Sequence, residues 1–275
     1  MAYGLRNSSQ NKRMKLEDCK FKFYCFLRYF SVALRFLTIL PFPELKEERK
    51  TDFSLEVANS TPFFPLVGFF IGILLFFIYF AFGFLSSDLL SLILLSFWIF
   101  VTGALHIDGF ADMIDGLSGG KDRKEILQIM QDAHLGAKGV AGVFLFLLLK
   151  FILIKNVASS SNALLFIFSP CAGRWGMVVG SSVIPYAKKK GMAEFSSFTG
   201  LKEVLLSTFI TAVLGVLILG FSSLFLLLIT GGFCLLFSLY LKKRMGGFTG
   251  DTLGALGEME EALVLLAGFL LARSI

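Results

Sequence analysis

The sequence alternates between long apolar runs and short polar segments that hold most of its charge. Most runs come close to the ~20 residues that a helix needs to cross about 30 Å of hydrocarbon. Of the 275 residues, 56% are hydrophobic and only 17% are charged. Because an open sheet leaves backbone groups unpaired in lipid, helices are the expected element. The sequence therefore predicts an all-α fold, a polytopic transmembrane helix bundle.

We expect about seven spans in this bundle. The predicted spans cover residues 62–84, 89–105, 139–154, 163–184, 204–219, 224–241 and 262–272. The last of these is short for a span, and a re-entrant segment is the alternative. Between the spans, residues 44–59, 106–138, 185–202 and 242–257 are expected to form polar connections.

Residues 23–40 are apolar but contain Arg28 and Arg35, which lie seven apart and so share one face of a helix. Two arginines in the middle of a lipid-facing span would be costly. We interpret this segment as an N-terminal amphipathic helix in the membrane interface, ended by Pro41 and Pro43. Residues 1–22 are interpreted as a basic cytoplasmic tail, and residues 23–275 as a single membrane-embedded domain.

The distribution of positive charge predicts the orientation. Connections 85–88, 156–162 and 220–223 contain no Lys or Arg, whereas the other connections and the tail contain most of them. Because Lys and Arg collect on the cytoplasmic side, the charged face is predicted to be cytoplasmic. The net charge of +6 is explained in the same way, and a nucleic-acid partner is not expected. The four cysteines form no CxxC pair and are interpreted as reduced structural thiols.

Three aspartates give the strongest chemical signal. Asp108, Asp112 and Asp115 are spaced i, i+4, i+7, so on a helix their carboxylates share one face. Like charges at this spacing destabilise a bare helix, and a divalent cation would neutralise them. Ligation by carboxylate oxygens favours Mg²⁺, Mn²⁺ or Ca²⁺ over zinc or copper. The alternative is a solvated acidic helix end.

Polar residues downstream extend this motif. Lys121 and Arg123 could offset phosphate charge, or could be ordinary positive-inside residues. Asp132 is a candidate further ligand. His106 and His134 are the only histidines, and each could act as an acid or base near neutral pH.

A glycine-rich segment forms the second signal. Gly247, Thr249, Gly250 and Thr252 surround Asp251, and this composition suits a turn whose amides approach an anion. Three glutamates follow at 258, 260 and 261, where they are expected to open the last helix and compensate its dipole. A supporting role for Glu258, seven residues after Asp251, is the alternative.

Arg174 is the third candidate, because it lies within the predicted span 163–184. An arginine at membrane depth is a functional-site hypothesis by default. It could clamp a phosphate from inside the bundle, or it could pair with a structural carboxylate.

Together these blocks resemble the motifs of the cobalamin synthase family, the adenosylcobinamide-GDP ribazoletransferases. The matching segments occur in the same order, at residues 36–43, 64–68, 105–112, 130–132, 173–175 and 247–255. The resemblance implies a catalytic domain over residues 23–275, in the cytoplasmic membrane of a bacterium or archaeon. It also implies that adenosylcobinamide-GDP and α-ribazole, or its 5′-phosphate, react to give adenosylcobalamin, or its 5′-phosphate, and GMP, with Mg²⁺ as cofactor. A homo-oligomer is left open.

The site residues would then take defined roles. Asp108, Asp112 and Asp115 would hold Mg²⁺ between the two phosphates, with Asp251 completing the metal site or positioning the ribazole. Asp115 or Asp132 would take the proton of the attacking hydroxyl, and Arg174 would act on the phosphate.

Two other functions compete with this reading. The D-G-x-x-D-x-x-D-G pattern is similar to the cation motif of the CDP-alcohol phosphotransferases, but Phe110 and Ala111 stand where that family has an Ala-Arg pair. A divalent-cation transporter is the non-enzyme alternative, because transporters often carry acidic residues near the midplane. No repeat of the aspartate motif supports it.

Overall fold

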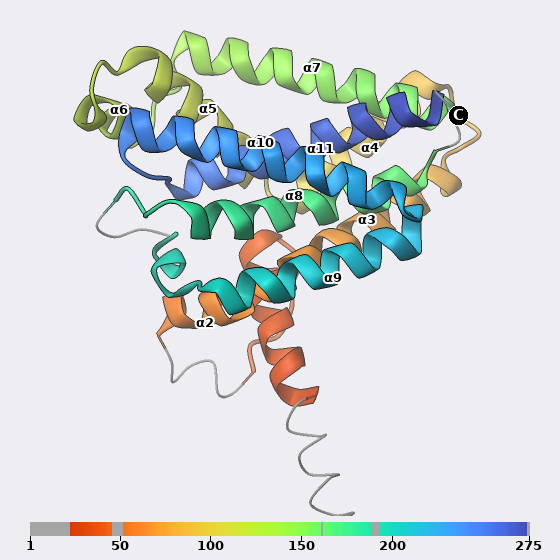
Figure 1. Ribbon diagram of the computed structural model, residues 1–275. Coiled ribbons are helices and arrows are strands. Elements are labelled where there is room, and N and C mark those ends of the chain that lie inside the picture. Colours follow the sequence, from red (N-terminus) through yellow and green to blue (C-terminus); the bar gives the residue numbers. More distant parts are fainter. Residues whose placement is uncertain (1–22, 46–51, 161, 189–192, 274–275) are drawn as a thin grey trace, which may run out of the picture.

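The computed structural model describes residues 23–45, 52–160, 162–188 and 193–273. The predicted tail over residues 1–22 lies outside this part of the chain. The described residues are almost entirely helical, as predicted, and their only β-type pairing is a single parallel bridge between Tyr186 and Phe248. Figure 1 shows the long helices running side by side, with connections gathered at two opposite ends.

A helix over residues 23–37 precedes the elements of the bundle. These elements are α2 (Phe53–Ser60), η2 (Thr61–Phe63), α3 (Phe64–Ala81), α4 (Ser87–Val101), α5 (Leu105–Gly119), α6 (Arg123–Ile129), α7 (Ala137–Ser159), α8 (Leu164–Val183), η3 (Glu194–Phe198), α9 (Leu201–Leu219), α10 (Ser222–Met245) and α11 (Gly250–Arg273).

Several of these helices are long and apolar enough to cross a membrane. Within the described residues, five stretches meet this condition alone, and the first of them is Phe53–Ala81, which joins α2, η2 and α3. α4 and α5 meet it together as a broken span bent by 87°. α11 has 24 residues, but the number of its charged side chains excludes it from this set. The chain is thus a multi-pass membrane protein whose described residues supply five or six such spans, and the predicted count of seven is not confirmed.

α8 is the central helix, and its side chains are buried along almost its whole length. Its neighbour α3 approaches so closely that a methyl group on Gly72 would lie 2.5 Å from the Cα of Ile167. By contrast, α9 and α10 expose large apolar side chains such as Leu217 and Leu228, which are 78% and 73% exposed. An outer surface of this kind suits hydrocarbon, because lipid solvates apolar side chains without cost.

Some predicted boundaries were wrong. The predicted connection 242–257 is only four residues long, because α10 continues to Met245 and α11 begins at Gly250. The last helix is therefore far longer than the predicted 262–272. Glu258 and Glu261 of this helix are buried against positive side chains, as described below. This pairing allows the helix to extend through a segment whose charge predicted a polar connection. The predicted polar stretch 106–138 likewise contains α5 and α6.

The predicted N-terminal helix is present. Its Arg28 donates to Glu56 of α2, with 3.1 Å between Nε and Oε2, and Arg35 lies 3.5 Å from Glu44. Both arginines that interrupted the apolar pattern therefore have carboxylate partners. In Figure 1 this red helix runs steeply across the direction of the bundle, and its location in the membrane interface stays a prediction.

The predicted grouping of the connections is confirmed. In Figure 1, α2, α6 and the turn before α11 lie at one end of the bundle, and the short turns after α3, α7 and α9 lie at the other. An ion pair of 2.6 Å between Asp88 and Lys155 joins two segments at this second end. The polar segments that carry the candidate site residues thus share one end, called the polar end below.

Candidate active site

The break between α4 and α5 directs the aspartate helix toward the polar end. Gly103 and Ala104 both have positive φ, at 62° and 56°, a conformation that residues other than glycine seldom adopt. The chain leaves α4 there, and α5 starts at Leu105. α5 forms the helix that the aspartate spacing required, with Asp108 exposed and Asp112 and Asp115 half-buried.

α5 packs directly on the first turns of α11. A methyl group on Gly109 would lie 2.7 Å from the Cα of Asp251, so only glycine permits this approach. One turn further along α11, Gly254 lies against the ring and backbone of His106. The contact places Asp251 between the turns of α5 that carry Asp108 and Asp112.

The glycine-rich segment is a turn that starts α11. Thr249 donates its amide to Oγ1 of Thr252 over 2.8 Å, and the amide of Thr252 donates to Oγ1 of Thr249 over 3.3 Å. These reciprocal bonds satisfy two amides at the start of the helix. Both threonines are fully buried. Thr249 and Thr252, which were predicted to bind ligand, therefore also stabilise the start of the helix. Gly250 is the first residue of that helix.

The segment after α8 is tied to this turn. Phe248 donates its amide to the carbonyl of Pro185 over 3.1 Å and accepts from the amide of Ala187 over 2.8 Å. Gly247 lies against the carbonyl of Pro185, where a side chain would not fit. The pairing places Lys188 3.2 Å from Oδ2 of Asp251. Partial burial, followed by the carboxylates of Asp251 and Glu194, raises the pKa of Tyr186.

Four carboxylates lie near the crossing of α5 and α11, and we call them the aspartate cluster: Asp108, Asp112, Asp115 and Asp251. The charges acting on Asp112 are those of the other three and of Lys188. Within the described part of the chain, Asp108 and Asp112 have neither a hydrogen bond nor an ion pair. The site thus carries an excess of negative charge with one nearby lysine, which favours binding of a cation.

Asp115 also holds the start of α7. Its Oδ2 accepts from the amide of Gly136 and its Oδ1 from the amide of Gly139, each over 2.7 Å. Free amides at a helix start prefer a negatively charged acceptor. Both oxygens therefore have a structural task, which leaves Asp115 less available as a base than Asp112.

The predicted residues downstream of α5 are not gathered in the cluster. Asp132 is exposed, and hydrogen bonds from the backbone and side chain of His134 lower its pKa. Lys121 is exposed, and its amide donates to Glu125 over 2.8 Å. Arg123 donates to the carbonyl of Ala187 over 3.0 Å and lies against Gly246, so it braces the two segments that position Asp251.

Arg174 lies inside the bundle, in a buried ion cluster. It pairs with Glu261 of α11, and both side chains are inaccessible to solvent. Lys150 of α7 lies 2.5 Å from Glu261 and 2.6 Å from Glu258. The Lys150 ammonium also lies 4.1 Å from the ring centroid of Trp98. Of the two roles considered for Arg174, pairing with a structural carboxylate is the one present here.

The predicted position of Glu258, Glu260 and Glu261 at the start of the last helix was wrong. Because α11 begins at Gly250, Glu258 and Glu261 lie two turns or more inside it, beyond reach of its N-terminal dipole. Glu258 lies 3.9 Å from Nδ1 of His106, which links the ion cluster to α5. Lys150 was missed altogether, although a lone lysine within the apolar run of α7 was a signal for it.

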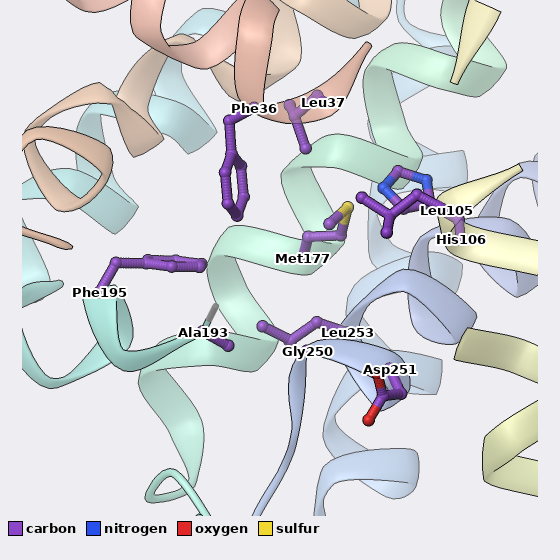
Figure 2. A pocket seen from close by; sticks show the side chains of 10 residues that line it. All are labelled: Phe36, Leu37, Leu105, His106, Met177, Ala193, Phe195, Gly250, Asp251 and Leu253. Carbon is purple, nitrogen blue, oxygen red and sulfur yellow. The ribbon is translucent and has the colours of Figure 1, made fainter. Parts of the chain in front are cut away.

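A narrow apolar pocket opens beside the aspartate cluster (Figure 2). Its polar side chains are His106 and Asp251, while the rest of its wall is apolar or glycine. The lining residues come from α5, α8, α11, η3 and the N-terminal helix: Phe36, Leu37, Leu105, His106, Met177, Ala193, Phe195, Gly250, Asp251 and Leu253.

The donor set at the cluster fits a magnesium ion. In the described part of the chain, no three acidic, histidine or cysteine side chains lie close enough together to hold a metal ion by themselves. Mg²⁺ seldom needs such a cage, because it usually takes one or two carboxylates with water and substrate phosphates. The unpaired carboxylates of Asp108 and Asp112 supply this kind of ligand.

Fold and site together define a class, the polytopic helical membrane proteins with a cluster of carboxylates at one end of the bundle. The family model of cobalamin-5-phosphate synthase matches residues 29–269, which include every element of the site. The chain belongs to this family.

Curated relatives agree with this assignment. A protein of Desulforamulus reducens named adenosylcobinamide-GDP ribazoletransferase is 35% identical, over 85% of this chain and 93% of its own length. Proteins of the same name from Geotalea daltonii and Alkaliphilus metalliredigens are 34% and 35% identical, each over 87% of this chain and over 96% and 93% of their own lengths. No solved structure matches the chain.

Proposed function

We propose that this protein is an adenosylcobinamide-GDP ribazoletransferase whose reaction takes place at the aspartate cluster. It would transfer the adenosylcobinamide-phosphate group to α-ribazole, or to its 5′-phosphate, and release GMP. The observation that carries the proposal is the meeting of Asp108 and Asp112 with Asp251, from two helices, in a chain of this family.

The reaction requires a site that stabilises negative charge on phosphate, and the aspartate cluster would supply one by binding a cation. A ribose hydroxyl attacks the cobinamide-side phosphorus, a new P–O bond forms, and the P–O bond to the GMP phosphate breaks. Negative charge spreads over the phosphoryl oxygens and the leaving phosphate during this exchange. Mg²⁺, when bound, would neutralise part of that charge. One or two of the carboxylates of Asp108, Asp112 and Asp251 would hold it, because no three acidic side chains of the described residues lie close enough together to do so.

The hydroxyl proton needs an acceptor, and we assign this role to a carboxylate oxygen of Asp112 that does not bind the metal. Asp115 is engaged with the amides at the start of α7, Asp132 with His134, and Asp251 with Lys188. Asp108 and Asp112 have none of these engagements, and Asp112 is the more buried of the two. A base must come within hydrogen-bond distance of the proton it removes, and the half-buried position of Asp112 at the cluster suits that requirement.

The cationic side chains would act on the phosphates and on the local fold. Lys188, at 3.2 Å from Asp251, can move its ammonium to a phosphate oxygen without leaving the site. Arg123 would keep the 185–188 segment and the turn before α11 in place. Arg174 would act from a distance, by fixing α8 against Glu261 of α11.

We further propose that the polar end faces the cytoplasm, in the inner membrane of a bacterium. Its connections carry most of the Lys and Arg, whereas the short turns at the other end carry none. Adenosylcobinamide-GDP carries a charged pyrophosphate, and a site at an aqueous end of the bundle can receive it without moving that charge into lipid.

The direct test uses purified protein in detergent or nanodiscs with Mg²⁺, adenosylcobinamide-GDP and α-ribazole. GMP and the joined cobalamin product should form in equal amounts. Release of CMP from a CDP-alcohol, with no GMP from adenosylcobinamide-GDP, would instead indicate a phospholipid-type phosphotransferase and would overturn the proposal.

A further inference from the structure

We propose that Lys188 and the metal ion are alternative partners of Asp251, and that the pyrophosphate of the substrate decides between them by drawing the Lys188 ammonium away. The inference rests on the proposed function and deepens it, because it couples the binding of a divalent cation to the binding of a diphosphate ester.

Asp251 is held differently from Asp108 and Asp112, which have no partner among the described residues. Its Oδ2 lies 3.2 Å from Nζ of Lys188 and accepts from Oγ1 of Thr249 over 3.1 Å. A carboxylate paired with an ammonium is a poorer ligand for a second cation, because the two positive charges repel each other. When Lys188 leaves, the bond from Thr249 still orients the carboxylate.

The aspartate cluster is not assembled in advance as a metal cage. Among the described residues, no three acidic, histidine or cysteine side chains lie close enough together to hold a metal ion. The charges acting on Asp112 are those of the other three aspartates and the opposing charge of Lys188. Lys188 thus supplies part of the positive charge that a divalent cation would bring, and its departure strengthens the attraction of the cluster for that cation.

The backbone before Lys188 is fixed, whereas its side chain can turn. The amide of Ala187 donates to the carbonyl of Phe248 over 2.8 Å, and the carbonyl of Ala187 accepts from Arg123 over 3.0 Å. The Lys188 side chain is 18% exposed, and its flexible four-carbon stem lets the ammonium change partner by rotation about side-chain bonds alone. The ammonium can therefore leave Asp251 while the fold stays in place.

A pyrophosphate competes well with Asp251 for Lys188. It carries more negative charge than one carboxylate, and its oxygens form charge-assisted hydrogen bonds with an ammonium. On its arrival Lys188 moves to a phosphate oxygen, and the freed carboxylate of Asp251 adds its charge to the cluster. Two ligands that favour the same arrangement strengthen each other's binding by an equal factor. Metal and pyrophosphate therefore bind with positive cooperativity.

The first experiment measures Mn²⁺ binding to purified protein in detergent, without substrate, from the electron paramagnetic resonance signal of free Mn²⁺. Mn²⁺ takes the same carboxylate ligands as Mg²⁺. Lys188→Met should bind Mn²⁺ at least about fivefold more tightly than the wild type, the lower end of ordinary coupling between two sites. Lys124→Met is the matched control, because it removes an exposed lysine at the same polar end, and it should bind Mn²⁺ as the wild type does.

Asp251→Asn separates direct competition from a general effect of charge. In the Asp251→Asn background, Lys188→Met should tighten Mn²⁺ binding by a smaller factor, because residues in contact show non-additive effects. An equal gain with and without Asp251 would overturn the inference, and so would a Lys188→Met protein that binds Mn²⁺ no more tightly than the wild type. Should Lys188→Met not fold, Lys188→Gln makes the same comparison.

Turnover tests the other half of the exchange. Lys188→Met should raise the KM for adenosylcobinamide-GDP about tenfold, as loss of a hydrogen bond to a charged group does, and leave the KM for α-ribazole unchanged. An unchanged KM for adenosylcobinamide-GDP would show that Lys188 does not reach the pyrophosphate, which would overturn the inference and leave the proposed function intact. Failure of the wild type to release GMP would instead overturn the function.

Discussion

At the scale of single residues, Lys150 has the largest expected effect on stability. It is the shared partner of Glu258 and Glu261, and all three side chains are buried. Lys150→Met should cost about 3–5 kcal/mol of unfolding free energy, because removing one partner leaves uncompensated buried charge. Denaturant unfolding in mixed micelles measures this. Lys155→Met, which removes an exposed ion pair, should cost about 0–1 kcal/mol of unfolding free energy. Equal losses of stability in the two variants would contradict this prediction.

Asp115 tests whether a carboxylate of the cluster also supports the fold. Asp115→Asn replaces one acceptor oxygen by an amide group that faces a backbone N–H. The substitution should lower the unfolding free energy by about 1–2 kcal/mol, as loss of a helix cap does. A stability equal to that of the wild type would mean that the start of α7 needs no anionic acceptor.

Residue by residue, the sequence was most informative where spacing alone defines geometry. The positions of Asp108, Asp112 and Asp115 predicted one helical face, and α5 carries them on it. Spacing could not reveal that Asp115 contacts α7, or that Arg174 pairs with a glutamate 87 positions away, since those contacts depend on how helices pack. The roles of these residues in catalysis stay predictions.

At the scale of elements, the close crossing of α5 and α11 holds the site together. Gly109→Ala would drive a methyl group into the backbone of Asp251. We expect the helices to separate, with loss of about 1–3 kcal/mol of stability and of most activity, because overpacked contacts cannot relax around backbone. Gly232→Ala is the matched control, because a methyl group there would meet nothing within 4 Å. Normal GMP release by Gly109→Ala would show that the crossing does not position the cluster.

The start of α11 and the bend between α4 and α5 were not predicted from the sequence. α11 carries four acidic residues among its first twelve, a composition that predicts a polar connection when the sequence is taken alone. Lys150 and Arg174, from two other helices, pair with the buried Glu258 and Glu261, which allows the helix to continue. The bend between α4 and α5 was equally hidden, because Ala104 adopts a conformation that its residue type does not favour.

At the scale of the whole molecule, the orientation in the membrane can be measured. In a cysteine-free background, Ser222→Cys marks the start of α10, next to the turn after α9, and Lys124→Cys marks the polar end. A membrane-impermeant thiol reagent added to intact cells should label only the first. Labelling of Lys124→Cys in intact cells, and not of Ser222→Cys, would reverse the proposed orientation.

The central claim is that Asp108, Asp112 and Asp251 hold a magnesium-bound pyrophosphate at the polar end of the bundle. Its most direct test is the rate of GMP release as a function of Mg²⁺ concentration. The wild type and Asp88→Asn, which alters an aspartate at the opposite end, should show the same saturable dependence on Mg²⁺. Asp112→Asn should lose at least about 100-fold in rate at every concentration. Undiminished release by Asp112→Asn, or full activity of the wild type with Mg²⁺ removed by a chelator, would contradict the account.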